Sequence, residues 1–198
     1  STSLEFVRQY LPDVASPTAT QAPWYLLLEL TASDQFALES LLERRLTQAL
    51  DDQQVVDVVI AQNLRQRESF WAIREAISAA QKLQGGSIKH DIALPIEHLA
   101  QFIDSTLPLI KQRLAGIRPC VFGHLGDGNL HFNLSQPVNM ETSQFLAQWS
   151  EFSRLVHDQV DKFGGSISAE HGIGQLKREE LVRYKSPVAL QLMRQIKQ

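Results

Sequence analysis

Cysteine is nearly absent from the sequence: Cys120 is the single one among 198 residues. No disulfide can therefore form within the chain, which favours a reducing compartment such as the cytoplasm. Long apolar runs are also missing, and none approaches the roughly 18 residues that a membrane-spanning helix needs. The formal net charge of −3 leaves no basic excess, so we expect no nucleic-acid partner. The class that remains is an ordinary globular protein with a hydrophobic core of its own.

The first 23 residues differ in composition from the rest of the chain. They contain Pro12, Pro17 and Pro23 among alanine, serine and threonine, which is typical of a linker or surface loop. The chain starts Ser-Thr-Ser, without a basic stretch followed by an apolar one, so we expect no signal peptide. The missing initiator methionine indicates a piece of a longer protein. We therefore expect an approach segment over residues 1–23 and one domain over 24–198.

The spacing of apolar residues predicts strands that alternate with helices. Trp24 to Leu30 and Val55 to Ala61 are short apolar runs, so both are expected to be buried strands. Further strands are predicted over 87–94 and 166–169, and a hairpin over 119–134. Helices are predicted over 34–50, 69–83, 95–114, 142–163 and from 187. The order β-α-β-α-β-α-β-β-α-β-α indicates an α+β fold, with a ferredoxin-like antiparallel sheet and helices packed on one face.

The stretch Gly123-His124-Leu125-Gly126-Asp127-Gly128-Asn129-Leu130-His131-Phe132-Asn133 is the most informative part of the sequence. Its Asp-Gly pair is a strong signal for a type I′ turn, in which both central residues need positive φ. A hairpin centred on that pair places Gly126 opposite Asn129, Leu125 opposite Leu130, and His124 opposite His131. Directly opposed side chains share a face, with Cβ atoms about 5 Å apart, so the two imidazoles can share a metal ion. Leu125, Leu130 and Phe132 then face a core, and Asn133 lies on the histidine face.

Two alternatives to this interpretation stay open. A longer turn or a bulge would break the predicted register of the hairpin. The two histidines can also be ordinary surface or core residues that bind nothing.

The segment Ala169-Glu170-His171-Gly172-Ile173-Gly174 is the second informative one. Neighbouring residues on a strand point to opposite sides, so Glu170 and His171 are expected to do different jobs. Glu170 can complete a set of two histidines and one carboxylate, which leaves coordination positions open for a substrate. His171 can then act as a general base near neutral pH. The alternative is a helix-capping carboxylate beside an unrelated histidine.

Together, G-H-L-G-D-G-N-L-H-F-N and S-A-E-H-G-I-G closely resemble the signature of the FAD-linked oxidases, in the group of D-lactate, glycolate and D-2-hydroxyglutarate dehydrogenases. The match is to their C-terminal, substrate-side domain and runs from about Trp24 to Gln198. The segments W-A-I-R-E, K-H-D-I-A-L-P and Y-K-S-P agree with it. The resemblance implies roles for eight residues: His124, His131 and Glu170 as ligands of zinc or manganese; His171 as the base; Arg74 and Lys89 as cations that hold the substrate carboxylate; Ser78 as a small hydroxyl residue of the substrate site; and Asn133 as a substrate or flavin contact.

The resemblance implies an FAD-dependent dehydrogenase or oxidase that converts a small D-2-hydroxy acid into the 2-oxo acid. The chemistry of the residues agrees, because a hydroxyl on a divalent metal loses its proton more easily. No side chain can accept the hydride, and the resemblance implies that a flavin does. The family carries that flavin on an N-terminal FAD-binding domain, and nothing in this chain resembles one. We therefore expect the piece alone to be inactive.

Within the group, the K-H-D-I-A-L-P and Y-K-S-P segments favour a 2-hydroxyglutarate or glycolate type over a lactate type. The expected partners are the hydroxy acid, the FAD-binding domain of the same full-length protein and an unidentified electron acceptor, with a homodimer as a candidate assembly. In a eukaryote the expected location is the mitochondrial matrix. Two other functions stay open: a flavin-independent metal-dependent hydrolase or oxygenase, and a non-catalytic metal-binding module with a closed four-ligand site.

Overall fold

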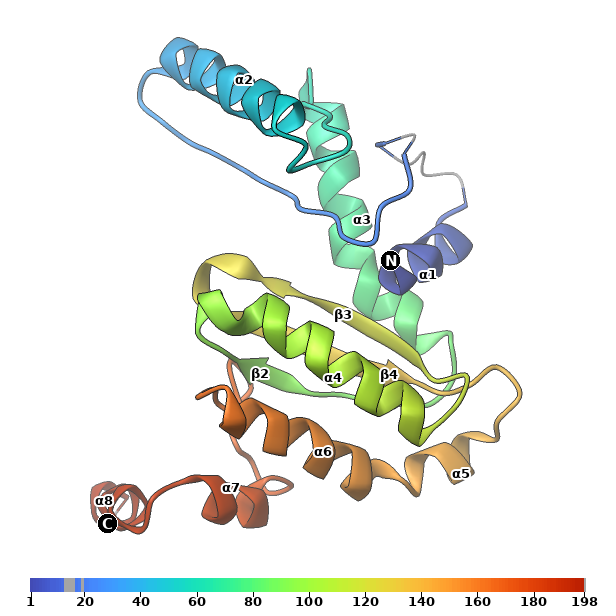
Figure 1. The fold of residues 1–198 in the computed structure, drawn as a ribbon, viewed down its shortest axis with the longest axis vertical. Coiled ribbons are helices and arrows are strands. Elements are labelled where there is room, and N and C mark those ends of the chain that lie inside the picture. Colours follow the sequence, from blue (N-terminus) through green and yellow to red (C-terminus); the bar gives the residue numbers. More distant parts are fainter. Residues whose placement is uncertain (13–16, 19, 198) are drawn as a thin grey trace. The chain divides into compact units, whose positions relative to one another are not determined.

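Figure 1 shows a computed structural model of the chain, which describes residues 1–12, 17–18 and 20–197. Residues 13–16 and 19 of the predicted approach segment lie outside the described residues. The chain divides into two compact units, one over Ser3–Leu83 with Ser1 and one over Gln84–Gln198 with Thr2. The sequence predicts one domain over 24–198. The extent of that single domain stays a prediction, since a compact unit of the structure need not be a separate domain.

The described residues of the first unit form the helices α1 (Thr2–Tyr10), α2 (Gln35–Asp51) and α3 (Leu64–Lys82). The carboxylate of Asp34 caps α2 by accepting the N–H of Ala37 at 3.1 Å. Asn63 caps α3 in the same way, which starts that helix five residues before the predicted position 69. The polar cap therefore sets the beginning of α3 at a residue before the range in which the spacing of apolar residues predicts a helix.

The predicted strands Trp24 to Leu30 and Val55 to Ala61 are wrong. Neither run belongs to a strand of the described structure. Apolar side chains of the first run are largely exposed, with Leu26 at 63% and Leu28 at 56%. Its Glu29 side chain instead accepts a hydrogen bond from Trp71 on α3 at 2.7 Å. Local β preference is not sufficient, because a strand also needs a neighbouring edge to pair with.

The second unit is built on a four-stranded antiparallel sheet, with β1 (Ser87–Ile88), β2 (Asp91–Ala93), β3 (Arg118–His124) and β4 (Asn129–Ser135). β4 is the central strand: β3 pairs along one edge, and β1 and β2 pair with the other edge in turn. The single strand predicted over 87–94 is therefore split. At the break, the His90 N–H donates to the Asn133 side-chain oxygen at 3.2 Å instead of to a ladder carbonyl.

The other helices of this unit are α4 (Leu99–Arg113), α5 (Thr142–Leu146), α6 (Trp149–Lys162), α7 (Arg178–Tyr184) and α8 (Pro187–Ile196). Helices α4 and α6 run along the sheet in Figure 1 and share its core. Phe102 of α4 and Phe132 of β4 meet edge to face with ring centres 5.4 Å apart, and Phe152 of α6 is fully buried in the same cluster. The predicted α+β fold is confirmed.

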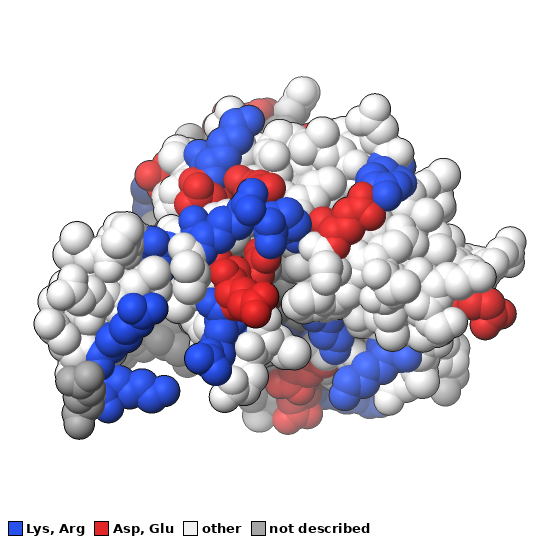
Figure 2. Space-filling model, turned by 90° about the horizontal axis from the view of Figure 1, so that it is seen from below, with Lys and Arg blue, Asp and Glu red and all other residues white. Residues whose placement is uncertain are grey.

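The surface carries charges of both signs. On the face seen in Figure 2, lysine and arginine side chains adjoin aspartate and glutamate side chains. The drawn part of that face shows no extended patch of one sign. Among the residues that the structure describes, no helix is both long and apolar enough to cross a membrane.

Candidate metal centre

The three predicted metal ligands converge at one end of the sheet. His124 ends β3, His131 lies in β4, and Glu170 follows the isolated bridge between Ala93 and Ser166. One ligand atom from each of His124, His131 and Glu170 lies within 4.8 Å of the other two. Two imidazole nitrogens and a carboxylate oxygen suit zinc or manganese, with positions left for water or a substrate. The donor set therefore fits a divalent metal, and that it binds one stays a prediction.

The register that predicted this convergence is wrong in detail. His124 lies opposite Asn129, and His131 lies opposite Phe122. The connection is a short 3-10 turn over Leu125–Asp127 followed by Gly128, so it holds four residues instead of two. The predicted pairs of Gly126 with Asn129, of Leu125 with Leu130 and of His124 with His131 do not form, and Leu125 is 53% exposed instead of facing the core.

The two histidines still share a face, because of the alternation along β4. A residue opposite Asn129 lies on the same face as Asn129, and His131 is two positions farther along that face. His124 and His131 are therefore diagonal neighbours, a spacing that long side chains can bridge. The longer turn arises at Asp127, whose carboxylate accepts the N–H of Asn129 at 3.0 Å.

Gly128 is required by the way the hairpin meets the rest of the sheet. Its carbonyl accepts the N–H of Leu94 at 3.0 Å, which ties the turn to the end of β2. A Cβ at this position would lie 2.0 Å from the Leu94 carbonyl oxygen, and φ is +70°. Any other residue here would push the turn away and move His124 with it.

Glu170 and His171 lie on a loop that leaves the sheet instead of on a strand. The predicted strand 166–169 is reduced to the bridge at Ser166 and one hydrogen bond from the Ala169 N–H to the Asp91 carbonyl, at 3.2 Å. Glu170 joins the ligand cluster, whereas the His171 side chain is 71% exposed, with its ring centre 6.1 Å from that of His131. The two side chains occupy different positions, and the base role of His171 stays a prediction.

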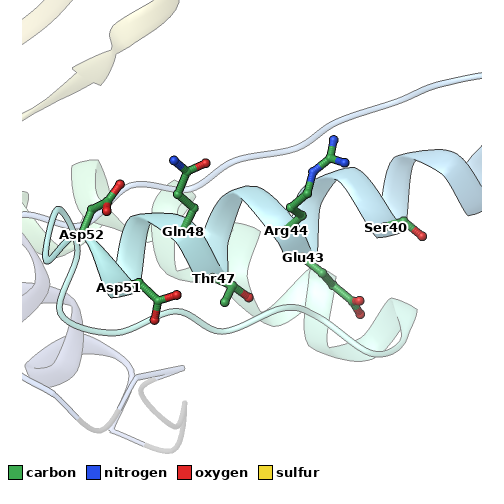
Figure 3. A pocket seen from close by; sticks show the side chains of 7 residues that line it. All are labelled: Ser40, Glu43, Arg44, Thr47, Gln48, Asp51 and Asp52. Atoms are coloured by element: carbon green, nitrogen blue, oxygen red, sulfur yellow. The ribbon is translucent and has the colours of Figure 1, made fainter.

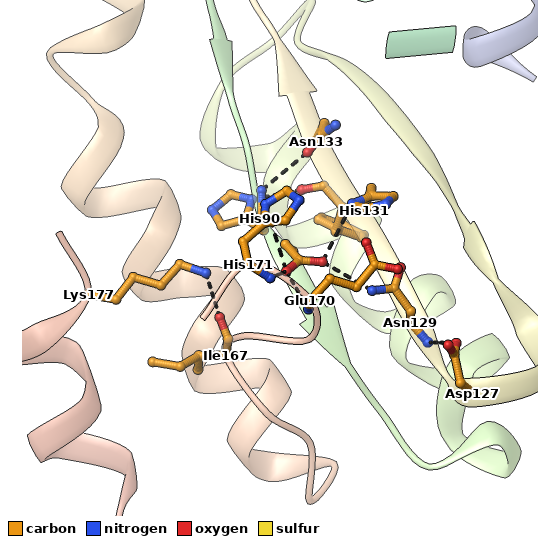
Figure 4. A network of polar contacts seen from close by, with 11 residues as sticks. His90, Asp127, Asn129, His131, Asn133, Ile167, Glu170, His171 and Lys177 are labelled. Atoms are coloured by element: carbon orange, nitrogen blue, oxygen red, sulfur yellow. Dashed lines mark hydrogen bonds and ion pairs between the residues drawn. The ribbon is translucent and has the colours of Figure 1, made fainter. Parts of the chain in front are cut away.

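Asp91 is the part of the site that the sequence-based predictions missed. Its side chain is 6% exposed, and its partners Asn129, Glu170 and His171 are labelled in Figure 4. Oδ2 accepts the backbone N–H groups of Glu170 and His171, each at 2.9 Å, and Oδ1 accepts Asn129 Nδ2 at 3.1 Å. Burial raises the pKa of Asp91, but these hydrogen bonds outweigh it and hold the pKa below its ordinary value. The signal that the sequence offered was an acidic residue within the strand predicted over 87–94.

Lys177 lies beside the hydrogen-bond network of Asp91. Its ammonium donates to the carbonyl of Ile167 at 2.7 Å, as Figure 4 shows, and so ties the start of α7 to the bridge region. Burial lowers the pKa of Lys177, and the nearby charge of Asp91 opposes that shift. The ammonium is committed to the backbone, so we do not assign it to a substrate.

The four predicted substrate residues come from both compact units. Asn133 lies on the histidine face of β4, buried, with its side-chain oxygen accepting the His90 N–H. Lys89 is exposed between β1 and β2. Arg74 and Ser78 lie on α3 of the first unit. The roles of all four stay predictions.

Two surface hollows have linings that do not include the three proposed ligands. The hollow in Figure 3 is lined by exposed residues that all come from α2 and its C-terminal cap. They are Ser40, Glu43, Arg44, Thr47, Gln48, Asp51 and Asp52. Ligand pockets usually combine an apolar lining with convergent polar groups, which one polar helix face cannot supply. A second hollow, between Ala93–Pro95, Gly164–Ser166 and Lys185, also lacks the three ligands.

Comparison with known proteins identifies the family. Residues 1–198 match the family described as FAD linked oxidases, C-terminal domain. The chain is 36% identical over 196 residues to "D-2-hydroxyglutarate dehydrogenase, mitochondrial" of Arabidopsis thaliana, covering 98% of this chain and 34% of that protein. It is 31% identical over 185 residues to "D-2-hydroxyglutarate dehydrogenase" of Stutzerimonas stutzeri, covering 93% and 39%. The chain thus spans little more than a third of the length of these curated relatives. The resemblance predicted from the two histidine-containing motifs is confirmed, and the chain belongs to the FAD-linked oxidases, as their C-terminal domain.

Proposed function

We propose that this chain is the substrate- and metal-binding domain of a flavin-dependent dehydrogenase that oxidises a small D-2-hydroxy acid to the 2-oxo acid. The observation that carries the proposal is the convergence of His124, His131 and Glu170, with His171 beside them, in a chain of this family. The names of its relatives favour 2-hydroxyglutarate over glycolate or lactate as the substrate.

His124, His131 and Glu170 would hold zinc or manganese, which when bound polarises the substrate hydroxyl and makes its proton more acidic. His171 would take up that proton: its imidazole is exposed, its ring centre lies 6.1 Å from that of His131, and imidazole is the side chain best suited to this role near neutral pH. FAD, bound mainly by an N-terminal domain of the full-length protein, supplies the acceptor for the hydride. This chain orients the acid and moves the proton.

The acid would be held by its carboxylate groups. Arg74 offers a planar pair of N–H donors that matches a carboxylate, and exposed Lys89 offers a point charge. Ser78 and Asn133 would complete the contacts, and Asn133 is also a candidate flavin contact. We further propose that FAD passes its electrons to an acceptor whose identity is open, and that a homodimer is a candidate assembly. We place the protein in the cytoplasm of a bacterium or in the matrix of a mitochondrion, since the Arabidopsis relative is named mitochondrial.

The exposure of the ligands bears on the rival functions. His124 and Glu170 are both exposed, and the described cluster contains three ligands. A structural metal is normally closed in by four ligands, so this open arrangement favours a site that binds a substrate over a non-catalytic module.

The test uses the full-length protein loaded with FAD, with D-2-hydroxyglutarate, glycolate and D-lactate as substrates and an artificial electron acceptor as the readout. We expect D-2-hydroxyglutarate to give the highest kcat/KM, and His131→Ala to lower it at least about 100-fold, because a metal contributes several kcal/mol to such a step. His98→Ala is the matched control, since His98 contacts the carbonyl of Phe163 and not the cluster.

Two results would overturn parts of the proposal. Metal-dependent turnover without any flavin would support a hydrolase or oxygenase instead. Metal content that is unchanged in His124→Ala, His131→Ala and Glu170→Ala would remove the ligand assignment.

A further inference from the structure

We propose that Asp91 is the positioning residue of this centre: its one carboxylate fixes the loop that carries Glu170 and His171 and also orients His131. The inference rests on the proposed function for its catalytic consequence, but its metal-binding consequence stands without it. Asp91 lies in β2, directly opposite His131 of β4, so both project from the same face of the sheet.

One oxygen of Asp91 organises the loop. The backbone N–H groups of Glu170 and His171 both point at Oδ2, each at 2.9 Å, although 79 and 80 residues of chain separate them from Asp91. The Asp91 carbonyl accepts the N–H of Ala169 as well. Asp91 therefore accepts the backbone N–H groups of three consecutive residues, through its carbonyl and its carboxylate. Two adjacent N–H groups that share an anionic oxygen hold the backbone between them in a narrow range of angles, and these hydrogen bonds are charge-assisted.

The other oxygen faces the ligand histidine. Oδ1 accepts Asn129 Nδ2 at 3.1 Å and lies 3.6 Å from Nδ1 of His131. A carboxylate beside Nδ1 favours the tautomer with its proton on Nδ1, which leaves the lone pair on Nε2 for a metal. Nδ1 of His171 lies 3.9 Å from Oδ2, so the proposed base faces the same charge.

Burial explains why an aspartate is needed here. The side chain is 6% exposed, so it takes little hydrogen bonding from water and its acceptors must be filled by the protein. Asparagine has nearly the same shape but replaces one oxygen with an amino group. If its oxygen faces the loop, the amino group faces the donor Nδ2 of Asn129 and Nδ1 of His131. The matched substitution thus removes the charge and opposes the metal-ready tautomer, with little change in volume.

The experiment measures zinc affinity of the full-length, FAD-loaded protein by competition with a chromophoric chelator, and the absorption spectrum of the cobalt-substituted protein. We expect Asp91→Asn to weaken zinc binding about 10- to 100-fold and to alter the cobalt bands, as for other residues that orient metal-bound histidines. With metal saturating, kcat should fall while KM changes little. The matched control is Asp158→Asn, because Asp158 of α6 accepts the Tyr184 hydroxyl at 2.8 Å and has no described contact with the cluster; its zinc affinity and kcat should stay within threefold of the parent.

The outcomes separate this inference from the proposed function. Zinc affinity and kcat of Asp91→Asn within threefold of the parent would overturn the positioning role, even if the parent oxidises 2-hydroxy acids. A parent that binds zinc but oxidises none of the acids would overturn the proposed function alone, and the zinc affinities would still decide the role of Asp91. If Asp91→Asn fails to fold, Asn129→Ser decides: it removes one donor to Oδ1 and should weaken zinc binding, whereas unchanged affinity would contradict the inference.

Discussion

Two groups of histidines in the second unit differ in every physical respect. His90 and His157 are each 1% exposed, and their rings meet edge to face with centres 5.7 Å apart. Nδ1 of His90 contacts the Phe132 carbonyl at 2.7 Å, and Nδ1 of His157 contacts the Glu180 carboxylate at 3.1 Å. The candidate centre instead holds two exposed imidazoles, those of His124 and His171, and the half-buried imidazole of His131, which is 17% exposed. The comparison teaches that surroundings, not residue type, separate an imidazole that packs from one that binds.

Burial makes protonation of the two buried imidazoles unfavourable. Burial lowers the pKa of His90 to about 3, because the charged form would lose its hydration. Burial also lowers the pKa of His157, although the Glu180 carboxylate opposes the shift. The buried pair is therefore neutral near pH 7 and serves the fold. The variants below test that division, in order of decreasing effect.

The largest effect is expected for His171→Ala in the full-length, FAD-loaded protein. Loss of a general base should lower kcat by about 10²- to 10⁴-fold. Zinc content should stay at the parent level, because Glu170 and not His171 belongs to the ligand cluster. Steady-state kinetics and elemental analysis check both statements. A variant that loses its metal along with its activity would move His171 into the ligand set.

His157→Ala should show the reverse pattern. It empties a buried position of α6 and removes one of the two partners of Glu180, so the free energy of unfolding should fall by about 2–4 kcal/mol. Zinc affinity should change less than twofold, because His157 does not contact the cluster. Urea denaturation and zinc competition measure the two quantities. A large loss of zinc affinity with unchanged stability would break the distinction between the two groups.

Acid should destabilise the fold through His90. The unfolded chain takes up a proton on this residue below its ordinary pKa of 6.5, whereas the folded chain does so only near 3. The free energy of unfolding contributed by His90 is therefore complete above pH 6.5 and declines as the pH falls toward 3. The slope reaches about 1.4 kcal/mol per pH unit for one proton. Urea denaturation between pH 7 and 5 should show this decline, and His90→Gln should flatten it. Equal slopes in both proteins would assign the acid sensitivity to other groups.

The smallest effect is expected for Arg154→Gln. Arg154 pairs with Glu180 at the surface, where an ion pair contributes about 0–1 kcal/mol. Glu180 keeps its contact with His157, so the buried pair should stay neutral and in place. Thermal unfolding at low and high salt measures the difference, which should shrink as salt rises. A loss comparable to that of His157→Ala would mean that the surface charge holds the buried histidine.

The sequence predicted the elements whose signals are local. The helix predicted over 34–50 and the hairpin predicted over 119–134 both depend on residues a few positions apart. The prediction of a strand over 24–30 was wrong because strand pairing depends on two segments, and the apolar pattern of one segment does not report whether a partner is present. The hairpin register failed because Asp127 captures the N–H of Asn129 and lengthens the turn.

The candidate site shows the same limit. Its three proposed ligands could be named because they lie in two short motifs, and the structure brings them together. Asp91 could not be given its place, because its partners at Glu170 and His171 lie about 80 positions away in the chain. A contact of that range is set by how β2, β4 and the loop meet, which no local spacing reports.

The central strand β4 gives one of its faces to the core, through Leu130, Phe132 and Leu134, and the other to the site, through Asn129 and His131. A single inserted residue within β4 would exchange these faces and bury His131 where Phe132 now packs. The same insertion beside Gly126, where an added Cβ would meet nothing within 4 Å, would leave both faces in place. We therefore expect insertions and deletions in related sequences to occur in the turn. The strand β4 beside it should accept substitutions but no change of length.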